Sequence, residues 1–434
     1  MHHRGTERDE GAQSREGGLF LLREQKKEFS CRRATEVTFF ALAKKVVFSL
    51  RNLISLCASV VGLLLLPVSA RADWAQDTLA KMSREEKIGQ LLIMPACQLR
   101  GEDHRNDLQK AIQQYHIGGV ILKQGTAAGQ LELIQWLQSL TKIPLLCVGD
   151  AEWGLSMRLT DAIVYPKNQA LGKLQDLSLI YDLGREIGRQ CKRVGLHVNL
   201  APVVDVNNNP NNPIIGPRSF GDDAGAVAER GAHWLRGHQK SGTAACAKHF
   251  PGHGDTSVDS HMDLPTIAHG IKRLESVELL PFRRAIAEGV ECVMTAHLMV
   301  PVLDPEKPVT FSHAVVTDLL KTRMKFKGVV ITDALNMKAL ANTYSVEEIA
   351  LNAFHAGHDI LLYGDHVAPN IDDILRVQLP RAFAALKSVS EEELDARVLK
   401  ILRLKQKFIG PTPSIADVYE DLHTKGALEL LKKL

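Results

Sequence analysis

The stretch GVVITDAL, residues 328–335, is a short run of mostly apolar and β-branched residues that carries an aspartate near its end. Seven further runs of this kind occur along the chain, and a loop and a helical stretch separate each from the next. They are LLIMPA (91–96), GGVILK (118–123), PLLCVGD (144–150), HVNLAPVVDV (197–206), TAACAKHF (243–250), ECVMTAHLMV (291–300) and DILLYG (359–364). Near-continuous apolar strands joined by amphipathic helices indicate a parallel sheet that helices cover on its outer face.

Eight such units predict an α/β fold, a single TIM-like (β/α)8 barrel with insertions. The alternative is an open, doubly wound sheet, but no GxGxxG motif follows the first strand. Helix starts support the division, since Ser83, Ser345 and Ser390 each precede a glutamate by three positions, the pattern of a capping box. The last of these opens segment 391–408, whose apolar spacing predicts a closing helix packed on the barrel.

Three parts follow from this division: an N-terminal extension (1–72), the barrel domain (73–410) and a peripheral C-terminal tail (411–434). No linker or change of composition marks a second domain within the barrel part, and we expect no sandwich domain after it. The whole chain carries a net charge of +3, which gives no sign of a nucleic-acid footprint.

The N-terminal extension contains a long apolar run from Leu53 to Ala72, and Lys44, Lys45 and Arg51 precede it. A basic stretch, an apolar core and then small residues predict an export signal. The alternative is an uncleaved membrane anchor, although the run is most apolar only up to Val68, short of the ~20 residues of a membrane span. Residues 1–72 hold 12 Lys or Arg and 7 Asp or Glu, a net charge of +5, so the remainder carries −2.

The seven cysteines do not form a recognisable pattern. Two lie in the N-terminal extension, and the other five lie in or beside apolar strand-like runs or a helical stretch. An odd number without a CxxC pair argues against a disulfide framework or a zinc site. We therefore expect these five cysteines to be buried as small apolar side chains.

Titratable side chains stand at the ends of several predicted strands. They are Asp150 after the third, Asp205 after the fourth, Lys248 and His249 in the fifth, His297 near the end of the sixth and Asp333 after the seventh. Charged groups at the ends of buried strands are costly unless they are paired. In a barrel all these ends converge on one mouth, where barrel enzymes hold their active sites, so the pattern predicts an active site.

The loop after the fifth strand, KHFPGHGDTSVDSHMDLP (248–265), gathers three histidines and three aspartates. Near its tip Asp259 and His261 are two positions apart, and an aspartate beside a histidine can fix its tautomer and raise its basicity, so we favour an acid/base loop. One alternative is a metal site built from His249, His253, Asp255 and His261, and another is a hydrogen-bonded plug over the barrel. A phosphate cradle is excluded because GxxxxGK[ST] is missing.

Three further segments supply candidate side chains. Asp333, at the end of the seventh strand, can act as a nucleophile on an acetal carbon, as in retaining glycosidases, or can cap a helix beginning near Leu335. In GDAEWGLSMRL (149–159), Asp150 and Arg158 can hydrogen-bond sugar hydroxyls. In IIGPRSFGDD (214–223), Arg218 can clamp a polar substrate through two hydrogen bonds.

Together KHFPGHGDTSVDSHMDLP, GVVITDALNM, GPRSFG and DAEWGLSMRL resemble glycoside hydrolase family 3, and within it the bacterial β-N-acetylglucosaminidase (β-N-acetylhexosaminidase) branch. The resemblance covers most of residues 75–410. It implies a TIM-like barrel with Asp333 as nucleophile, His261 as general acid/base and Asp259 as the partner of that histidine. It also implies that the terminal N-acetylglucosamine is bound by Asp150, Arg158, Arg218, Lys248 and His249.

The chain departs from the family in one place and differs from part of it in another. Many members have D-x-E-G-G-R after the third strand, whereas Trp153 and Leu155 occupy two of these positions here, although Arg158 still matches. Other members take a carboxylic acid from a second, sandwich-like domain, and we expect the loop histidine to supply the acid instead.

The resemblance therefore implies a retaining exo-β-N-acetylglucosaminidase that removes terminal N-acetylglucosamine, with neither metal nor cofactor. Together with the predicted export signal, it makes peptidoglycan fragments the expected substrate. The alternatives are another family 3 β-glycosidase such as a β-glucosidase, a glycoside phosphorylase, a metal-dependent hydrolase and a sugar-binding module without activity. We expect no nucleic-acid partner, and membrane contact only through an uncleaved N-terminal segment. The predicted location is the periplasm or cell envelope, with a cytoplasmic or membrane-anchored protein as alternatives.

Overall fold

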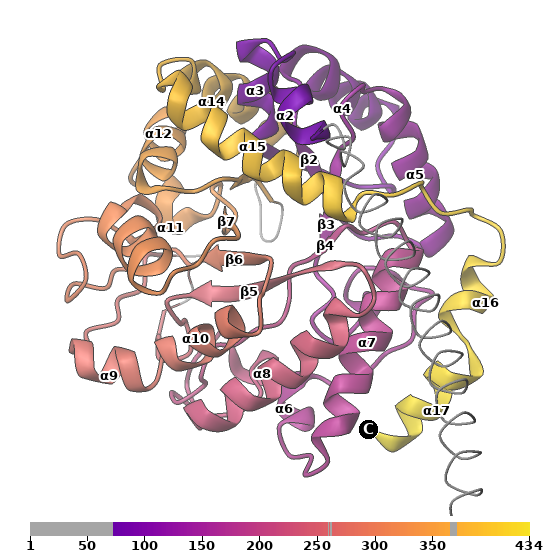
Figure 1. Cartoon of the computed structure of the whole chain (residues 1–434), viewed down its shortest axis with the longest axis vertical. Helices are drawn as coiled ribbons and strands as arrows, with labels where there is room; N and C mark the ends of the chain where they lie inside the picture. The colour runs from indigo at the N-terminus through magenta and orange to yellow at the C-terminus, as the bar shows by residue number, and fades with distance from the viewer. Residues whose placement is uncertain (1–72, 259, 261–262, 365–370) are drawn as a thin grey trace, which may run out of the picture. The chain divides into compact units, whose positions relative to one another are not determined.

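The computed structural model describes residues 73–258, 260, 263–364 and 371–434 of the 434-residue chain. The predicted barrel is confirmed: eight parallel strands lie in the order β7-β6-β5-β4-β3-β2-β1-β8. A parallel bridge between Ile331 of β7 and Ile360, just before β8, joins the two ends of the sheet. Helices surround the strands (Figure 1), and no β-sandwich occurs among the described residues.

All eight predicted strands are present, mostly shorter than the apolar runs that predicted them. Their bounds are β1 Leu92–Ala96, β2 Gly119–Leu122, β3 Leu146–Gly149, β4 Val198–Asn199, β5 Ala244–Phe250, β6 Cys292–Thr295, β7 Val329–Thr332 and β8 Leu361–Leu362. Every residue of these strands is buried, as expected for a sheet that side chains fill from within and helices cover from outside.

The fourth strand, β4, falls furthest short of its predicted length, since only Val198–Asn199 of the apolar run 197–206 is a strand. Pro202 has no N–H to continue the ladder of hydrogen bonds. The chain nevertheless stays beside β5, since Lys248 N donates to Pro202 O at 3.1 Å and Val204 N donates to Lys248 O at 2.9 Å. This contact carries Asp205 to the end of β5, next to His249.

The helices lie in the connections between strands and at both ends of the described chain. Their bounds are α2 Trp74–Leu79, α3 Arg84–Gln90, α4 Glu102–Tyr115, α5 Ala127–Ser139, α6 Asn168–Leu171, α7 Leu177–Arg193, α8 Ala224–Gln239, α9 Ile271–Ser276, α10 Leu279–Ala287, α11 Lys338–Ala341, α12 Val346–Ala356, α13 Ile371–Asp373, α14 Leu379–Leu386, α15 Glu391–Phe408, α16 Val418–Leu422 and α17 Lys425–Lys433. The 3-10 turns are η1 Leu155–Met157, η2 Gly216–Arg218 and η3 Val309–Phe311, and the π-helical segments are η4 Ala314–Arg323 and η5 Ile374–Gln378.

Two of the three predicted capping boxes form completely. Ser83 and Ser345 each accept the N–H of the glutamate three positions on, and that glutamate accepts the serine N–H in return. At Ser390 the hydroxyl accepts from Glu393 N at 3.2 Å and also lies 3.0 Å from the carboxylate of Glu393. The helix that Ser390 begins is α15, the predicted closing helix, and it packs against α2, α3 and β7.

The ends of the chain are described unequally. The tail forms α16 and α17, both of which contact α7, and Arg193 of α7 binds Asp421 at 2.6 Å. The predictions for residues 1–72 lie outside the described residues. Within the described ranges, no helix combines the length and hydropathy that a membrane crossing requires.

The five described cysteines are free and buried, as predicted.

Candidate active site

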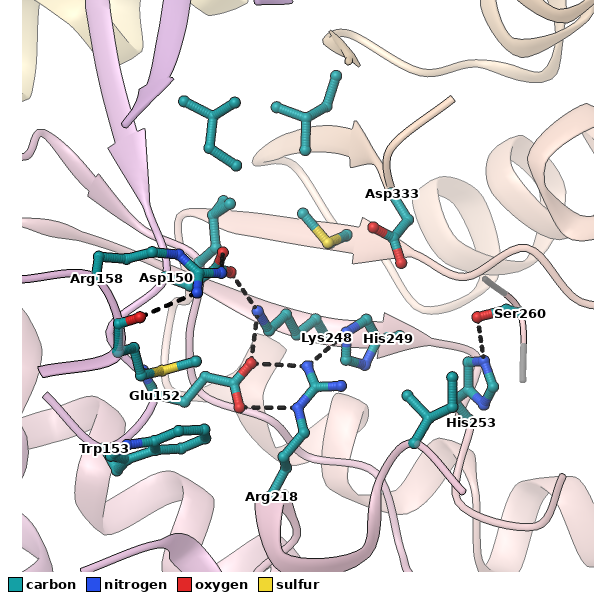
Figure 2. A pocket seen from close by; sticks show the side chains of 16 residues that line it. Asp150, Glu152, Trp153, Arg158, Arg218, Lys248, His249, His253, Ser260 and Asp333 are labelled. Atoms are coloured by element: carbon teal, nitrogen blue, oxygen red, sulfur yellow. Dashed lines mark hydrogen bonds and ion pairs between the residues drawn. The ribbon is translucent and has the colours of Figure 1, made fainter. Parts of the chain in front are cut away.

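A pocket of about 280 Å³ opens at the carboxyl ends of the strands (Figure 2). Its side chains come from several strands and from the loops that follow them, which is where active sites lie in this fold. Its lining residues are Ile121, Asp150, Glu152, Trp153, Met157, Arg158, Leu200, Ile214, Arg218, Lys248, His249, His253, Ser260, Met294, Asp333 and Leu362. Six of the eight side chains predicted for the site are among them.

Asp150 links two predicted sugar-binding cations on one side of the pocket. It follows β3 directly, and its two carboxylate oxygens bind different partners. Oδ2 lies 2.6 Å from Arg158 Nη2, and Oδ1 lies 2.8 Å from Lys248 Nζ. Because Arg158 follows η1 and Lys248 belongs to β5, Asp150 joins a side chain from a loop and one from a strand in the pocket wall.

Glu152 is a site residue that we did not predict, although it lies within the segment that held Asp150 and Arg158. Its carboxylate pairs with Arg218 through both oxygens, at 3.0 Å to Nε and 2.7 Å to Nη2, and with Lys248 Nζ at 2.9 Å. The Glu152 side chain is almost completely buried. Glu152 could have been predicted from its position two residues after the strand-end Asp150, because residues two positions apart at the end of a strand can both reach the mouth of the barrel.

The charges of this group reinforce one another. Burial alone would raise the pKa of Glu152, but the charges of Arg218 and Lys248 outweigh it and lower the pKa to about 2. Burial alone would also lower the pKa of Lys248, yet Asp150 and Glu152 raise it. The pKa of Arg218 is raised as well, because Glu152 overcomes the effect of burial. All three groups therefore stay charged near neutral pH.

His249 is held by Asp205, which lies behind the pocket wall. His249 Nδ1 is 2.7 Å from Asp205 Oδ2, and the same carboxylate accepts the backbone N–H of His249 and of His253. His249 Nε2 lies 3.2 Å from Arg218 Nη2. Burial raises the pKa of Asp205, but the charges and hydrogen bonds of His249 and His253 reverse the effect and lower it. Asp205 thus orients a sugar-binding candidate without lining the pocket itself.

Hydrogen bonds fix the first part of the loop after β5. His253 is buried, with Nδ1 at 2.9 Å from Thr256 Oγ1 and Nε2 at 3.1 Å from Ser260 Oγ. Burial lowers the pKa of His253 to about 4, so its ring is neutral near neutral pH and bridges the hydroxyl groups of Thr256 and Ser260. Asn212 donates to His253 O at 2.8 Å and to Thr256 Oγ1 at 3.2 Å. Gly254 is required here, since a Cβ atom would lie 1.8 Å from Val206 O.

The predicted acid/base pair, Asp259 and His261, lies outside the described residues. Ser260, which stands between them in the sequence, is buried and lines the pocket. Ser260 and His253 lie on the same side of the pocket as Asp333, and Lys248 and His249 lie between that side and Glu152 (Figure 2).

Asp333 follows β7 and lines the pocket across from Asp150, Arg158 and Trp153 (Figure 2). Its backbone N–H donates to Thr295 O at 3.1 Å, and its Oδ1 accepts the N–H of Ala334 at 2.7 Å. The alternative that Asp333 caps a helix is wrong, because the next helix, α11, begins at Lys338 after Met337. His297 lies outside the pocket lining and supports this segment, with Nε2 at 3.0 Å from Ala334 O.

Trp153 lines the pocket at the position where the chain departs from its family pattern. Lys167 Nζ lies 5.0 Å from the centre of the indole ring, within the range of a cation–π contact. The substitution leaves the Asp150–Arg158 pair intact. The departure therefore adds an aromatic wall to the pocket and preserves its charged one.

The histidines proposed for the alternative metal site have separate partners. Of the described members, His249 binds Asp205, His253 binds Thr256 and Ser260, and Asp255 binds His269 Nε2. Asp255, His269 and Glu278 do form a group compact enough for a cation. The guanidinium of Arg273 already provides a positive charge to this group, since its Nη2 lies 3.3 Å from Glu278 Oε1 and 3.8 Å from Asp255 Oδ2.

Comparison with known proteins places this barrel in a family. The model of the glycosyl hydrolase family 3 N-terminal domain matches residues 83–404. The chain is 32% identical over 341 residues to "Beta-hexosaminidase A" of Pseudoalteromonas piscicida, covering 71% of this chain and 56% of that protein. It is 32% identical over 342 residues to a "Beta-N-acetylglucosaminidase/beta-glucosidase" of Cellulomonas fimi, covering 76% and 59%. The chain thus spans less than two thirds of either relative.

A solved structure extends the likeness to three dimensions. The family 3 β-N-acetylglucosaminidase from Paenibacillus sp. str. FPU-7 superposes with a TM-score of 0.72 at 37% identity, over 81% of this chain and 68% of that one. Residues 83–404, which the family model matches, contain β1–β8 and every described side chain of the pocket. The chain therefore belongs to glycosyl hydrolase family 3.

Proposed function

We propose that this protein is a retaining exo-β-N-acetylglucosaminidase, which removes terminal β-linked N-acetylglucosamine from glycans. The observation that carries the proposal is the placing of Asp333 across one pocket from a charged group made of Asp150, Glu152, Arg158, Arg218 and Lys248. Family membership and the printed names of the relatives support glycoside hydrolysis. The pocket volume of about 280 Å³ is near the lower end for ligand sites, about 300 Å³, which suits a single terminal sugar.

In the proposed mechanism the charged side of the pocket holds the sugar hydroxyls. The pairing of Asp150, Glu152, Arg158, Arg218 and Lys248 fixes these side chains before the substrate arrives, which lowers the entropy lost on binding. Trp153 offers an apolar surface beside them. Asp333 attacks the anomeric carbon, and the bond from that carbon to the leaving oxygen breaks as a covalent glycosyl-enzyme forms.

The proton that the leaving oxygen needs comes from His261, paired with Asp259. In the second step neutral His261 accepts a proton from water, water attacks the anomeric carbon, and Asp333 is released. A histidine with a pKa near its usual value of about 6.5 can serve as acid and then base around neutral pH. The anchoring of the preceding loop by His253, Asn212 and Asp205 supports this assignment, because it holds the chain next to the pocket up to Ser260.

A second candidate activity is β-glucosidase, since the Cellulomonas fimi relative carries both activities in its name. Transfer to phosphate in place of water is a further alternative. Hydrolysis of matched aryl N-acetylglucosaminide and aryl glucoside, with and without phosphate, separates the three, because a phosphorylase releases sugar 1-phosphate. With the predicted export signal, we propose peptidoglycan fragments in the periplasm or cell envelope as the natural substrate.

The first test replaces the nucleophile. Asp333→Asn should reduce kcat for an aryl N-acetyl-β-glucosaminide by on the order of 10⁴, comparable to losses seen when other catalytic groups are removed. Asp318→Asn, at an exposed carboxylate, is the matched control and should retain wild-type turnover. His261→Ala should slow substrates with poor leaving groups far more than those with good ones. Wild-type rates for both active-site variants on all substrates would refute the proposed mechanism.

A further inference from the structure

Three side chains that can bind a metal ion meet beside the loop that follows β5. They are Asp255 in that loop, His269 two positions before α9, and Glu278 at the start of α10. One donor atom of each, a carboxylate oxygen or a ring nitrogen, lies within 4.8 Å of the donor atoms of the other two. None of the three residues lines the catalytic pocket. We call this group the three-donor site.

Glu278 is the buried member of the three-donor site. Its side chain is only 2% exposed, and its Oε1 lies 3.3 Å from Arg273 Nη2. Its other oxygen, Oε2, is buried and has no hydrogen-bond partner among the described residues. A buried carboxylate oxygen that has lost its water without gaining a partner raises the free energy of the fold. A cation bound at the three-donor site would supply the missing partner.

The charge of the three-donor site leaves room for a cation. Its two carboxylates and the guanidinium of Arg273 give a net charge of −1 when the ring of His269 is neutral. Arg273 Nη2 lies 3.8 Å from Asp255 Oδ2, beyond hydrogen-bonding distance, and the Arg273 side chain is 39% exposed. The guanidinium also meets the side-chain amide of Asn208. Arg273 therefore offsets one of the two carboxylates, and it has another partner when a metal ion takes its place beside them.

The backbone fixes the positions of the donors. Gly252 has a φ of 134°, and a Cβ atom at this residue would lie 3.0 Å from Glu278 Cβ, so the loop packs directly on Glu278. On the other side of the site, Ile267 N donates to Met299 O at 2.8 Å and holds the segment that leads to His269. Donors that are fixed before a ligand binds lose less conformational entropy on binding.

The donor types indicate which metal fits. Zinc is held by imidazole nitrogens and carboxylate oxygens at about 2.0–2.2 Å, often by three side chains and a water. Magnesium and calcium prefer ligand sets made of oxygen alone. We infer that Asp255, His269 and Glu278 bind a zinc-type divalent ion, which fastens the loop after β5 to the starts of α9 and α10.

Binding exchanges one cation for another at His269. Its Nε2 now meets Asp255 Oδ2 through a hydrogen bond, and the metal ion replaces the proton between these two atoms, which is released to water. No electron is transferred, and the ion has a structural role. The inference does not depend on the proposed activity, because the three-donor site lies outside the catalytic pocket.

The test titrates the full-length chain with zinc chloride after EDTA treatment and dialysis. Calorimetry should show one zinc ion bound per chain, at least about 100-fold more tightly than magnesium or calcium, because those ions take imidazole poorly. Saturating zinc should also raise the Tm by several degrees, since a ligand that binds only the folded chain stabilises it.

Two variants remove single donors. His269→Gln and Asp255→Asn should each weaken zinc binding at least tenfold, since even changes next to a metal ligand cost about 10–100-fold. Zinc should then no longer raise the Tm. The control is His313→Gln, because His313 Nδ1 lies 3.4 Å from Asp318 Oδ1 in an exposed histidine–aspartate pair elsewhere on the surface. This control should bind zinc as tightly as the wild type.

X-ray absorption at the zinc edge of the wild type keeps the inference testable if the variants fail to fold. The expected first shell holds nitrogen and oxygen atoms at about 2.0–2.2 Å, with a single imidazole. Sulfur at about 2.3 Å, or two imidazoles, would place the ion elsewhere and overturn the inference. Absence of zinc binding, or equal affinity in the wild type and both donor variants, would also overturn it. A wild type without glycosidase activity would contradict only the proposed function.

Discussion

Glu152 is the residue on which the charged side of the pocket depends. It is the carboxylate shared by Arg218 and Lys248, and its burial removes the screening that water gives to surface pairs. Without it, Arg218 would retain its contact with His249, and Lys248 its contact with Asp150. The two cations would then face each other with less negative charge between them.

Glu152→Gln should therefore reduce both stability and activity. Removing one partner of a buried ion pair costs about 3–5 kcal/mol, so we expect the free energy of unfolding to fall by about 3 kcal/mol. We also expect kcat/KM to fall at least tenfold, because Arg218 and Lys248 lose their fixed positions. Urea denaturation and steady-state kinetics measure the two effects.

The matched control for this change is Glu347→Gln, which removes an equally well-formed two-bond pair with Arg381 on the surface. Exposed pairs contribute about 0–1 kcal/mol, so this variant should remain close to the wild type. Equal losses in the two variants would contradict the assigned importance of Glu152.

At the scale of an element, the loop after β5 is held by the segment after β4. Asn212 is the main connection, because its amide donates to His253 O and Thr256 Oγ1 while its oxygen accepts the N–H groups of Ile214 and Ile215. The side chain thus joins two loops that are more than 40 positions apart in the sequence. Loops placed in this way can present catalytic groups on a rigid barrel.

Asn212→Ala should loosen this connection. Unsatisfied buried polar groups cost about 1–3 kcal/mol, so the free energy of unfolding should fall by about 2 kcal/mol. If the loop carries the acid/base histidine, kcat for substrates with poor leaving groups should also fall by about tenfold. Asn211→Ala, at the exposed neighbouring position, is the control and should change neither quantity. An unaltered kcat in Asn212→Ala would show that this anchoring is unimportant for catalysis.

At the scale of the whole molecule, α15 closes the barrel and brings a lysine into its interior. Lys405 is almost completely buried, and its Nζ lies 2.6 Å from Gln90 Oε1. Burial lowers its pKa from 10.5 to about 7. In the unfolded chain the same lysine keeps its proton up to about pH 10.

The folding equilibrium should therefore depend on pH through Lys405. Between pH 7 and pH 10 the unfolded chain keeps a proton on this lysine that the folded chain has released. The contribution of Lys405 to the free energy of unfolding therefore increases steadily as the pH rises from 7 to 10. The difference in unfolding free energy between wild type and Lys405→Met should shift by about 2 kcal/mol in favour of the wild type from pH 7 to pH 9.

Urea denaturation at the two pH values measures this shift. Lys432→Met, at an exposed position on α17, should show no shift relative to the wild type. Parallel pH profiles for the wild type and Lys405→Met would contradict a depressed pKa at Lys405.

The sequence by itself determined the order of strands and helices and the chemistry at the strand ends, because apolar runs, capping serines and strand-end charges are local patterns. Strand-end charges located the pocket side chains Asp150, Lys248, His249 and Asp333, and the loop segments that resemble the family located Arg158 and Arg218. Only the tertiary structure decided the partners: Glu152 meets Arg218 across 66 positions, and Asp205 reaches His249 across 44. Such pairs depend on distances across the barrel, which residue spacing does not record.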